Sequence, residues 1–127
     1  MNKSLLVKKS PGKGRGVFAG KDFNKGQIIE RCHVIILPKK EMDTLDKTLL
    51  YDYYFLWGKK LNQAAILLGH GELYNHSYKS NTAFWGDLKN NRMVFVSVRD
   101  IKKGEEITIN YNGIHNDPTP FEIKRKK

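Results

Sequence analysis

Apolar residues in this chain come in short runs, and charged or turn-forming residues separate one run from the next. Runs of this length, bounded by Gly, Asn and Pro, are typical of β-rich domains. The pattern predicts strands at residues 5–7, 17–19, 27–37, 51–57, 64–68, 82–88, 93–98 and 106–111. Asn90 and Asn91 tolerate positive φ and favour a hairpin between two of them. A short helix is expected at residues 39–46, after Pro38, so the chain is predicted to be mostly β with few short helices.

The last predicted strand carries a tyrosine on an otherwise aliphatic face. Side chains alternate between the two faces of a strand, so Ile107, Ile109 and Tyr111 share one face. Glu106, Thr108 and Asn110 would occupy the other face. Apolar neighbours would hold the Tyr111 ring in place, and this would fix its hydroxyl oxygen in space.

The 127 residues suit a single domain, expected over residues 1–127, that buries a core without disulfides or metals. No segment approaches the roughly 18 consecutive apolar residues of a membrane span. The first ten residues lack the pattern of a signal peptide. Cys32 is the only cysteine, which excludes an internal disulfide and a cysteine-based zinc cluster. We therefore expect an intracellular protein, cytoplasmic or nucleoid-associated or nuclear, with no membrane partner and no metal site.

The formal net charge of +10 at pH 7 allows two interpretations. Lysine pairs and the basic residues 124–127 could contact the phosphates of a nucleic acid, or they could form a solvated surface that keeps the protein soluble. The second interpretation is favoured because no base-stacking motif accompanies the charge. The segment at residues 41–52 is acidic, in contrast to the rest of the chain, and could attract a cationic ligand. Its charged residues are Glu41, Asp43, Asp46, Asp52 and, with opposite sign, Lys47 alone.

Three local patterns occur in a fixed order along the chain. They read KGRGVF at residues 13–18, LYNHS at residues 73–77 and GEEITINY at residues 104–111, with Asn81 four residues beyond the second. Each pattern alone has a structural explanation, since glycines serve turns and Asn, His and Ser side chains satisfy backbone groups. In this order and spacing, however, they resemble the SET-domain family of protein-lysine methyltransferases. The resemblance is strongest to its short, free-standing microbial and viral members.

The resemblance covers residues 8–113, which leaves residues 114–127 as a C-terminal extension with a basic tail. It implies a SET-domain β-clip of several small sheets with a C-terminal pseudoknot. In that crossing the final strand passes under a neighbouring loop, which brings Tyr111 beside Asn75 and His76. It also implies methyl transfer from S-adenosyl-L-methionine to the ε-amine of a lysine in a basic protein, histone-like or other.

The resemblance assigns each pattern to a part of the site. Main-chain atoms of the glycine-rich turn would approach the cofactor, and Tyr111 would be the catalytic tyrosine. The expected cofactor-binding residues are Lys13, Gly14, Arg15, Gly16, Asn75, His76 and Tyr111. The residues expected to line the lysine channel are Tyr53, Tyr74, Phe84 and Tyr111. Ordinary core packing is the alternative explanation for Tyr53 and Phe84.

The reaction needs a neutral amine, but a lysine with a pKa near 10.4 is protonated at neutral pH. Supplying the free amine from water costs about 4–5 kcal/mol. An apolar channel and a nearby sulfonium both lower that pKa, because both disfavour a second cation. Tyr111 is a poor base at neutral pH, so we expect it to orient the amine and stabilise the transition state, with deprotonation through water.

The sequence departs from the family pattern at several positions. Tyr78 and Ser80 stand where the family often has cysteine and proline, and Asn110 stands where it often has aspartate. The zinc-binding cysteines that follow the domain in many histone enzymes are missing. The C-terminal wall of the lysine channel must therefore come from another residue, and Phe121 is our candidate. The alternative function is a non-catalytic chromatin or nucleic-acid binding module that keeps the fold. The resemblance also allows a homodimer.

Overall fold

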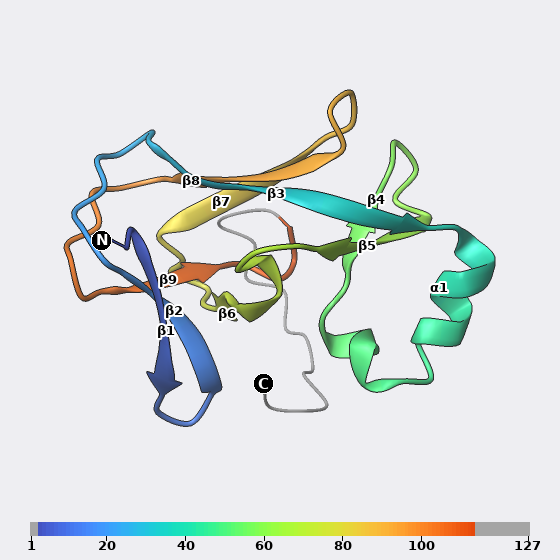
Figure 1. Ribbon diagram of the computed structural model, residues 1–127, viewed down its shortest axis with the longest axis horizontal. Helices are drawn as coiled ribbons and strands as arrows, with labels where there is room; N and C mark the ends of the chain where they lie inside the picture. Colours follow the sequence, from blue (N-terminus) through green and yellow to red (C-terminus); the bar gives the residue numbers. More distant parts are fainter. Residues whose placement is uncertain (1–2, 114–127) are drawn as a thin grey trace.

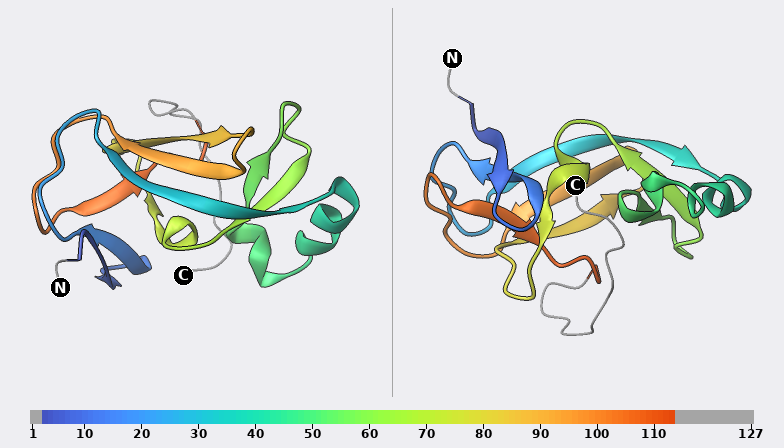
Figure 2. Two further views of the ribbon diagram at one scale, coloured as in Figure 1. Left: turned by 45° about the horizontal axis from the view of Figure 1, so that its top comes forward. Right: turned by 90° about the horizontal axis from the view of Figure 1, so that it is seen from below.

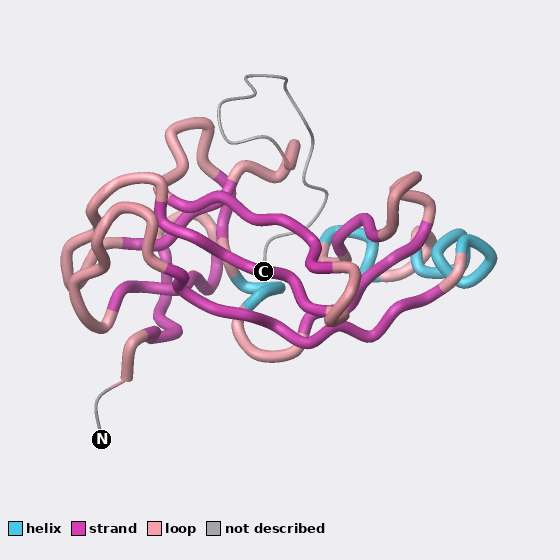
Figure 3. The backbone as a smooth tube through the Cα atoms, turned by 90° about the horizontal axis from the view of Figure 1, so that it is seen from above, coloured by secondary structure: helices cyan, strands magenta, loops and turns pink. Residues whose placement is uncertain are grey.

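The computed structural model describes residues 3–113, which form two small sheets with few helical turns (Figures 1 and 3). The strands are β1 (Leu5–Ser10), β2 (Gly14–Ala19), β3 (Ile28–Leu37), β4 (Phe55–Trp57), β5 (Gln63–Leu67), β6 (Asn75–His76), β7 (Thr82–Asp87), β8 (Arg92–Ser97) and β9 (Glu106–Ile109). The helical segments are α1 (Lys39–Leu45) and two 3₁₀ turns, η1 (Leu49–Asp52) and η2 (Gly71–Leu73). The prediction of a mostly β chain with few short helices is confirmed.

The larger sheet has five strands in the order β4-β5-β3-β8-β7, with every neighbouring pair antiparallel. Its central strand β3 is ten residues long and pairs with β8 along one part and β5 along another. Strands β7 and β8 form the expected hairpin, and Asn91 in its turn takes a φ of 51°. In the views of Figures 1 and 2, β3 and β8 run along one side of the molecule while β1, β2 and β9 lie on another.

The smaller sheet has four strands in the order β1-β2-β9-β6, and it contains the only parallel pair of strands in residues 3–113. That pair joins β6 to β9, with Asn75 opposite Thr108 and His76 opposite Ile109. The side chain of Asn81 holds β9 from the other direction, since it donates to the Glu106 carbonyl and accepts from the Thr108 amide, both at 2.9 Å. We call β6, β9 and Asn81 the crossing. The family resemblance implied such a crossing, as a pseudoknot.

The core lies where the two sheets face each other and includes Val17, Phe23, Phe95, Ile107 and Ile109. The aliphatic face of β9 points into this core, as the alternation of its side chains predicted. The opposite face is buried as well, although it is polar: Thr108 is 9% exposed and Asn110 is 1% exposed. The crossing covers both faces of the last strand, and a strand covered on both sides needs hydrogen-bonding partners for its polar face.

The prediction of a strand over residues 51–57 is wrong for its first half. Residues 49–52 form the turn η1, and the strand β4 covers only residues 55–57. The hydroxyl of Thr48 accepts a hydrogen bond from the Leu50 amide at 3.2 Å and so caps the turn, a local interaction that competes with strand pairing. The helix expected at residues 39–46 is confirmed as α1. Within residues 3–113, no helix has the length and apolar character needed to cross a bilayer.

Candidate functional site

The crossing brings the end of the last strand against the LYNHS segment. The backbone amide of Tyr111 donates a hydrogen bond to Nδ1 of His76 at 3.1 Å. The Tyr111 hydroxyl donates to the carbonyl oxygen of Tyr74 at 2.7 Å. The rings of His76 and Tyr111 lie 5.4 Å apart between centroids. Tyr111 therefore lies beside the two residues with which the pseudoknot was expected to join it, Asn75 and His76.

His76 acts here through its side chain. Since Nδ1 accepts the Tyr111 amide proton, the ring must be neutral, with its own proton on Nε2. Burial and, to a smaller extent, the positive charge of Lys13 lower the pKa of His76 to about 4. The ring also packs edge-on against Tyr78 at a centroid distance of 4.3 Å. A neutral, enclosed imidazole of this kind fixes the position of the residue that carries the phenol.

Asn75 joins the glycine-rich hairpin to the last strand. Its Nδ2 donates to the carbonyl of Arg15 at 2.9 Å and to a carboxylate oxygen of Glu106 at 2.8 Å. The other carboxylate oxygen of Glu106 accepts from the Ser10 hydroxyl at 2.8 Å. A Cβ atom on Gly16 would lie 2.4 Å from Glu106 and 2.8 Å from Asn75. Gly16 thus leaves room for this hydrogen-bond network, a structural reason that the sequence did not disclose.

The remaining predicted cofactor residues lie on the β1–β2 hairpin. Gly14 has a φ of 76°, in the left-handed region that favours glycine, so the tight turn depends on it. Lys13 and Arg15 are exposed. The charge of Lys13 acts on the His76 ring, which places this lysine on the same side of the molecule as the crossing.

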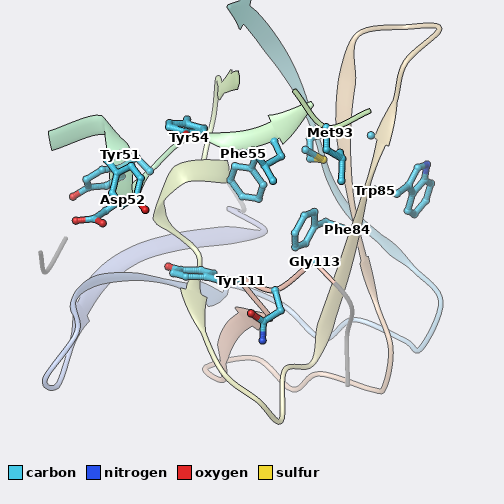
Figure 4. Close-up of a pocket in the computed structure, with 14 residues that line it drawn as sticks. Tyr51, Asp52, Tyr54, Phe55, Phe84, Trp85, Met93, Tyr111 and Gly113 are labelled. Atoms are coloured by element: carbon cyan, nitrogen blue, oxygen red, sulfur yellow. The ribbon is translucent and has the colours of Figure 1, made fainter. Parts of the chain in front are cut away.

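On another side of Tyr111 lies a cavity of about 430 Å³, which we call the aromatic pocket (Figure 4). Its lining residues are Tyr51, Asp52, Tyr53, Tyr54, Phe55, Leu56, Leu61, Phe84, Trp85, Gly86, Met93, Tyr111, Asn112 and Gly113. The rings of Phe55, Phe84 and Tyr111 face a common space, and the first two meet edge to face at a centroid distance of 5.1 Å. Tyr53, Phe84 and Tyr111, three of the four predicted channel residues, line this pocket.

The side chain of the fourth predicted channel residue, Tyr74, does not line this pocket. Its ring is fully buried at 0% exposure and packs on Phe95, with 4.6 Å between centroids. Its hydroxyl donates to Glu30 at 2.6 Å, on the side of the core away from the pocket. Only the Tyr74 carbonyl reaches the site, through the hydroxyl of Tyr111. A buried phenol needs a strong acceptor, and the Glu30 carboxylate supplies one inside the core.

The phenol of Tyr111 stays protonated at neutral pH. Burial raises the pKa of Tyr111 well above its usual value. Nearby groups raise that pKa further: Tyr53, Glu106, Glu72 and Asp52. A phenol with these neighbours serves as a hydrogen-bonding group and not as a base.

The acidic segment is partly neutralised by its own neighbours. Asp43 forms an ion pair with Lys39, a lysine that precedes the acidic segment. Asp46 accepts a hydrogen bond from the Tyr54 hydroxyl at 2.5 Å. Asp52 is the carboxylate of this segment that lines the aromatic pocket. Of the acidic residues that were expected to attract a cationic ligand, Asp52 is therefore the one that lies at the pocket.

Sequence reasoning missed Glu30, Glu106 and the side-chain role of His76. Glu106 could have been found, since the alternation of the last strand places it beside Thr108 and Asn110 on the polar face. No local signal marks Glu30, which contacts Tyr74 across 44 residues of sequence. The predicted wall residue Phe121 lies outside the described residues.

Comparisons with known proteins identify the family to which this chain belongs. A family model described as the SET domain matches residues 14–112. The H3 lysine-37 specific histone-lysine N-methyltransferase of Schizosaccharomyces pombe is 31% identical over 108 residues, covering 84% of this chain and 72% of that protein. The N-lysine methyltransferase KMT5A-A of Danio rerio is 32% identical over 119 residues. That match covers 84% of this chain and 35% of the zebrafish protein.

Solved structures show the same fold. CpSET8 from Cryptosporidium is 28% identical with a TM-score of 0.67, covering 92% of this chain and 59% of that one. A humanized mutant of the Chaetomium thermophilum Polycomb Repressive Complex 2 is 20% identical with a TM-score of 0.72. The likeness covers 94% of this chain and 16% of that chain, and it concerns the fold alone. With the family model matched over residues 14–112, the chain belongs to the SET domain family.

Proposed function

We propose that this chain, a protein-lysine methyltransferase, transfers a methyl group from S-adenosyl-L-methionine to the ε-amine of a lysine in a basic protein. The observation that carries the proposal is the position of Tyr111. It lies between the aromatic pocket and the hydrogen-bonded group formed by Asn75, His76 and the glycine-rich hairpin. One phenol can therefore contact both an amine in the pocket and a ligand held by the crossing.

The residues around the crossing fit S-adenosyl-L-methionine. The Nδ2 atom of Asn75 faces Arg15 and Glu106, which turns its side-chain oxygen away from them, and this oxygen can accept from the methionyl ammonium. Lys13 supplies a positive charge for the carboxylate, and Gly14 and Gly16 would let the backbone approach closely. When bound, the cofactor supplies an electrophilic methyl group on a positively charged sulfur.

The aromatic pocket would receive the lysine side chain. Rings from Tyr53, Phe55 and Phe84 give it walls that suit four methylene groups and disfavour an ammonium ion. Walls of this kind lower the pKa of the entering amine and recover part of the roughly 4–5 kcal/mol that deprotonation costs in water. The proton leaves through water, because Tyr111 is itself protonated and hydrogen-bonded.

Tyr111 orients the amine. Its hydroxyl proton is already donated to the Tyr74 carbonyl, so its oxygen meets the pocket as an acceptor. An acceptor at that point can take an N–H of the neutral amine and turn the nitrogen lone pair toward the crossing. Alignment of two reacting groups in this way is one of the largest single contributions to enzymatic rate.

The substrate is proposed to be a basic protein, and Asp52 is the residue that would favour it. This carboxylate lines the aromatic pocket of a chain whose formal charge is +10, so it offers a cationic segment an attractive point on a repulsive surface. The yeast and zebrafish relatives carry the names of protein-lysine methyltransferases, which agrees with a protein substrate. Contact with such a substrate would be made inside the cell, in the cytoplasm, the nucleoid or the nucleus.

The test is incubation with isotopically labelled S-adenosyl-L-methionine and a panel of histones, ribosomal proteins and other basic proteins, followed by mass spectrometry. We expect a mass gain of one or more methyl groups on a lysine, and none with a Tyr111→Phe variant. A filter-binding measurement with DNA over a series of salt concentrations tests the alternative, a binding module without turnover. Steep, salt-sensitive DNA binding together with no methyl transfer and no cofactor binding would overturn the proposal.

A further inference from the structure

The half-buried carboxylate of Glu30 lies outside both the aromatic pocket and the crossing, yet it is connected through Tyr74 to the phenol of Tyr111. Glu30 is on β3 in the larger sheet, and its side chain is 15% exposed. One oxygen accepts from the Tyr74 hydroxyl at 2.6 Å. The other accepts from the backbone amide of His70 at 3.0 Å and lies 3.0 Å from Nδ1 of the same histidine. Even a half-buried carboxylate beside the core would be costly without such a set of partners.

The surrounding chain is shaped to accommodate this carboxylate. Gly69 has a φ of 89°, and a Cβ atom there would lie 2.5 Å from the Glu30 carboxylate. Burial raises the pKa of Tyr74 well above its usual value, and the charge of Glu30 raises it further, so the phenol remains a donor. The Tyr74 hydroxyl therefore keeps the proton that it donates to Glu30 at neutral pH.

Tyr74 connects Glu30 to the site through its ring and its backbone carbonyl. Its ring is held at one end by Glu30 and on its face by Phe95. The next residue, Asn75, is held by its own side chain to the Arg15 carbonyl and to Glu106. The peptide group between Tyr74 and Asn75 thus lies between two fixed side chains, and its carbonyl is the acceptor for the Tyr111 hydroxyl at 2.7 Å.

We infer that Glu30 is a positioning residue for the methyl transfer: by holding the Tyr74 ring across the two sheets, it fixes the carbonyl that orients the hydroxyl of Tyr111. A carbonyl in this position uses the hydroxyl proton and directs the oxygen lone pairs toward the pocket. An aliphatic residue at position 30 could pack as well, but it would not tie β3 to the segment that leads into β6. The inference about rate rests on the proposed function, whereas the one about the Tyr111 hydroxyl does not.

Two conservative variants test the inference. Tyr74→Phe removes the hydroxyl that Glu30 binds and keeps the ring and the charge, and Glu30→Gln keeps the shape and removes the charge. We expect kcat to fall about tenfold in each, as small misplacements of reacting groups do. The dissociation constant for S-adenosyl-L-methionine should stay within about twofold, because Asn75 and the hairpin keep their contacts. The double variant should be no slower than the slower single variant, since both changes break one connection.

The matched control is Glu105→Gln, which removes an exposed carboxylate that pairs with Arg99 and should change none of these values. A second readout does not depend on turnover: the ring Cζ resonance of Tyr111 in protein labelled with ¹³C-tyrosine, assigned by its loss in Tyr111→Phe. It should shift in Tyr74→Phe and Glu30→Gln and stay in place in Glu105→Gln. An unmoved resonance in folded Tyr74→Phe overturns the inference, whatever the activity. A shifted resonance in a protein that methylates nothing would sustain it while the proposed function fails.

Discussion

The two sides of Tyr111 are built in different ways. On the side of the crossing, short hydrogen bonds between buried or half-buried groups fix every partner: Asn75 to Arg15 and Glu106, and His76 to the Tyr111 amide. Half of the residues that line the aromatic pocket are aromatic, and rings such as Phe55 and Phe84 meet edge to face and impose no single direction. Directional bonds suit a ligand of fixed shape, such as a cofactor, whereas packed rings suit a flexible aliphatic chain.

The difference teaches where a substitution should be tolerated. A buried polar network fails as a unit, because removal of one member leaves the others unsatisfied. A pocket of rings can rotate or shift by a few tenths of an ångström and keep most of its contacts. We therefore expect damage on the crossing side to be larger and to affect both cofactor binding and stability, and damage on the pocket side to be smaller and to affect the substrate.

The largest effect should come from the residue that joins the two sides. Tyr111→Phe removes the hydroxyl alone, and the amide that binds His76 remains. We expect kcat to fall by about 10²–10³, the usual loss when an oriented polar group is removed from a transition state, with little change in cofactor affinity. Single-turnover kinetics and calorimetric titration measure the two. Loss of cofactor binding with the activity would mean that Tyr111 is structural.

Alanine at two glycines compares the sides directly. A Cβ atom on Gly16 would lie 2.4 Å from the Glu106 carboxylate, in the hydrogen-bond network, whereas on Gly86, which lines the aromatic pocket, it would lie 3.1 Å from the ring of Trp57. Gly16→Ala should lower the free energy of unfolding by about 1–3 kcal/mol and weaken cofactor binding. Gly86→Ala should cost less than about 1 kcal/mol, because the nearest atom lies farther from the added methyl group, at 3.1 Å, and takes part in no hydrogen-bond network. Equal losses in chemical denaturation would remove the distinction between the two sides.

The residues of the crossing could be predicted from sequence better than those of the aromatic pocket. The chemistry of the crossing is carried by contiguous segments, so the LYNHS segment and Tyr111 were recognisable. Alternation along the last strand could have placed Glu106 on its polar face, but it does not reveal the contact with Asn75, 31 residues away. Glu30 was not recognisable, because it acts through a contact that spans 44 residues of sequence. The ring of Tyr74 was misplaced because a tyrosine next to Asn75 can point to either side of the chain. The shape of the aromatic pocket could not be predicted, because a capped turn replaces the first half of the strand that was predicted at residues 51–57.

The neutral state of His76 gives the crossing side a pH dependence just below neutral pH. The pKa of His76 is about 4 in the fold and about 6.5 when unperturbed. The unfolded chain therefore binds more protons between these values, so stability is fully present above pH 6.5 and is lost as the pH falls toward 4. Protonation of Nδ1 also breaks the bond from the Tyr111 amide.

Denaturation at pH 7 and pH 5 measures this dependence. The His76→Asn variant keeps an oxygen acceptor that does not titrate, so its stability should change less between the two pH values than that of the wild type. The exposed His33 provides the matched control, and His33→Asn should leave the wild-type difference intact. An equal pH dependence in His76→Asn and wild type would show that other groups produce it.

The smallest effect is expected at the edge of the aromatic pocket, where charge attracts the substrate from solvent. Asp52→Asn should raise the KM for a basic protein about two- to fivefold and leave kcat unchanged, because a half-exposed charge contributes on the order of 1 kcal/mol or less. The difference should shrink as salt is added, since screening weakens such an attraction. Asp43→Asn is the matched control: its carboxylate is already paired with Lys39, so its KM should move less. If both substitutions raise the KM equally, the attraction comes from the whole acidic segment and not from Asp52. If neither changes the KM, apolar contacts in the pocket are the source of substrate affinity.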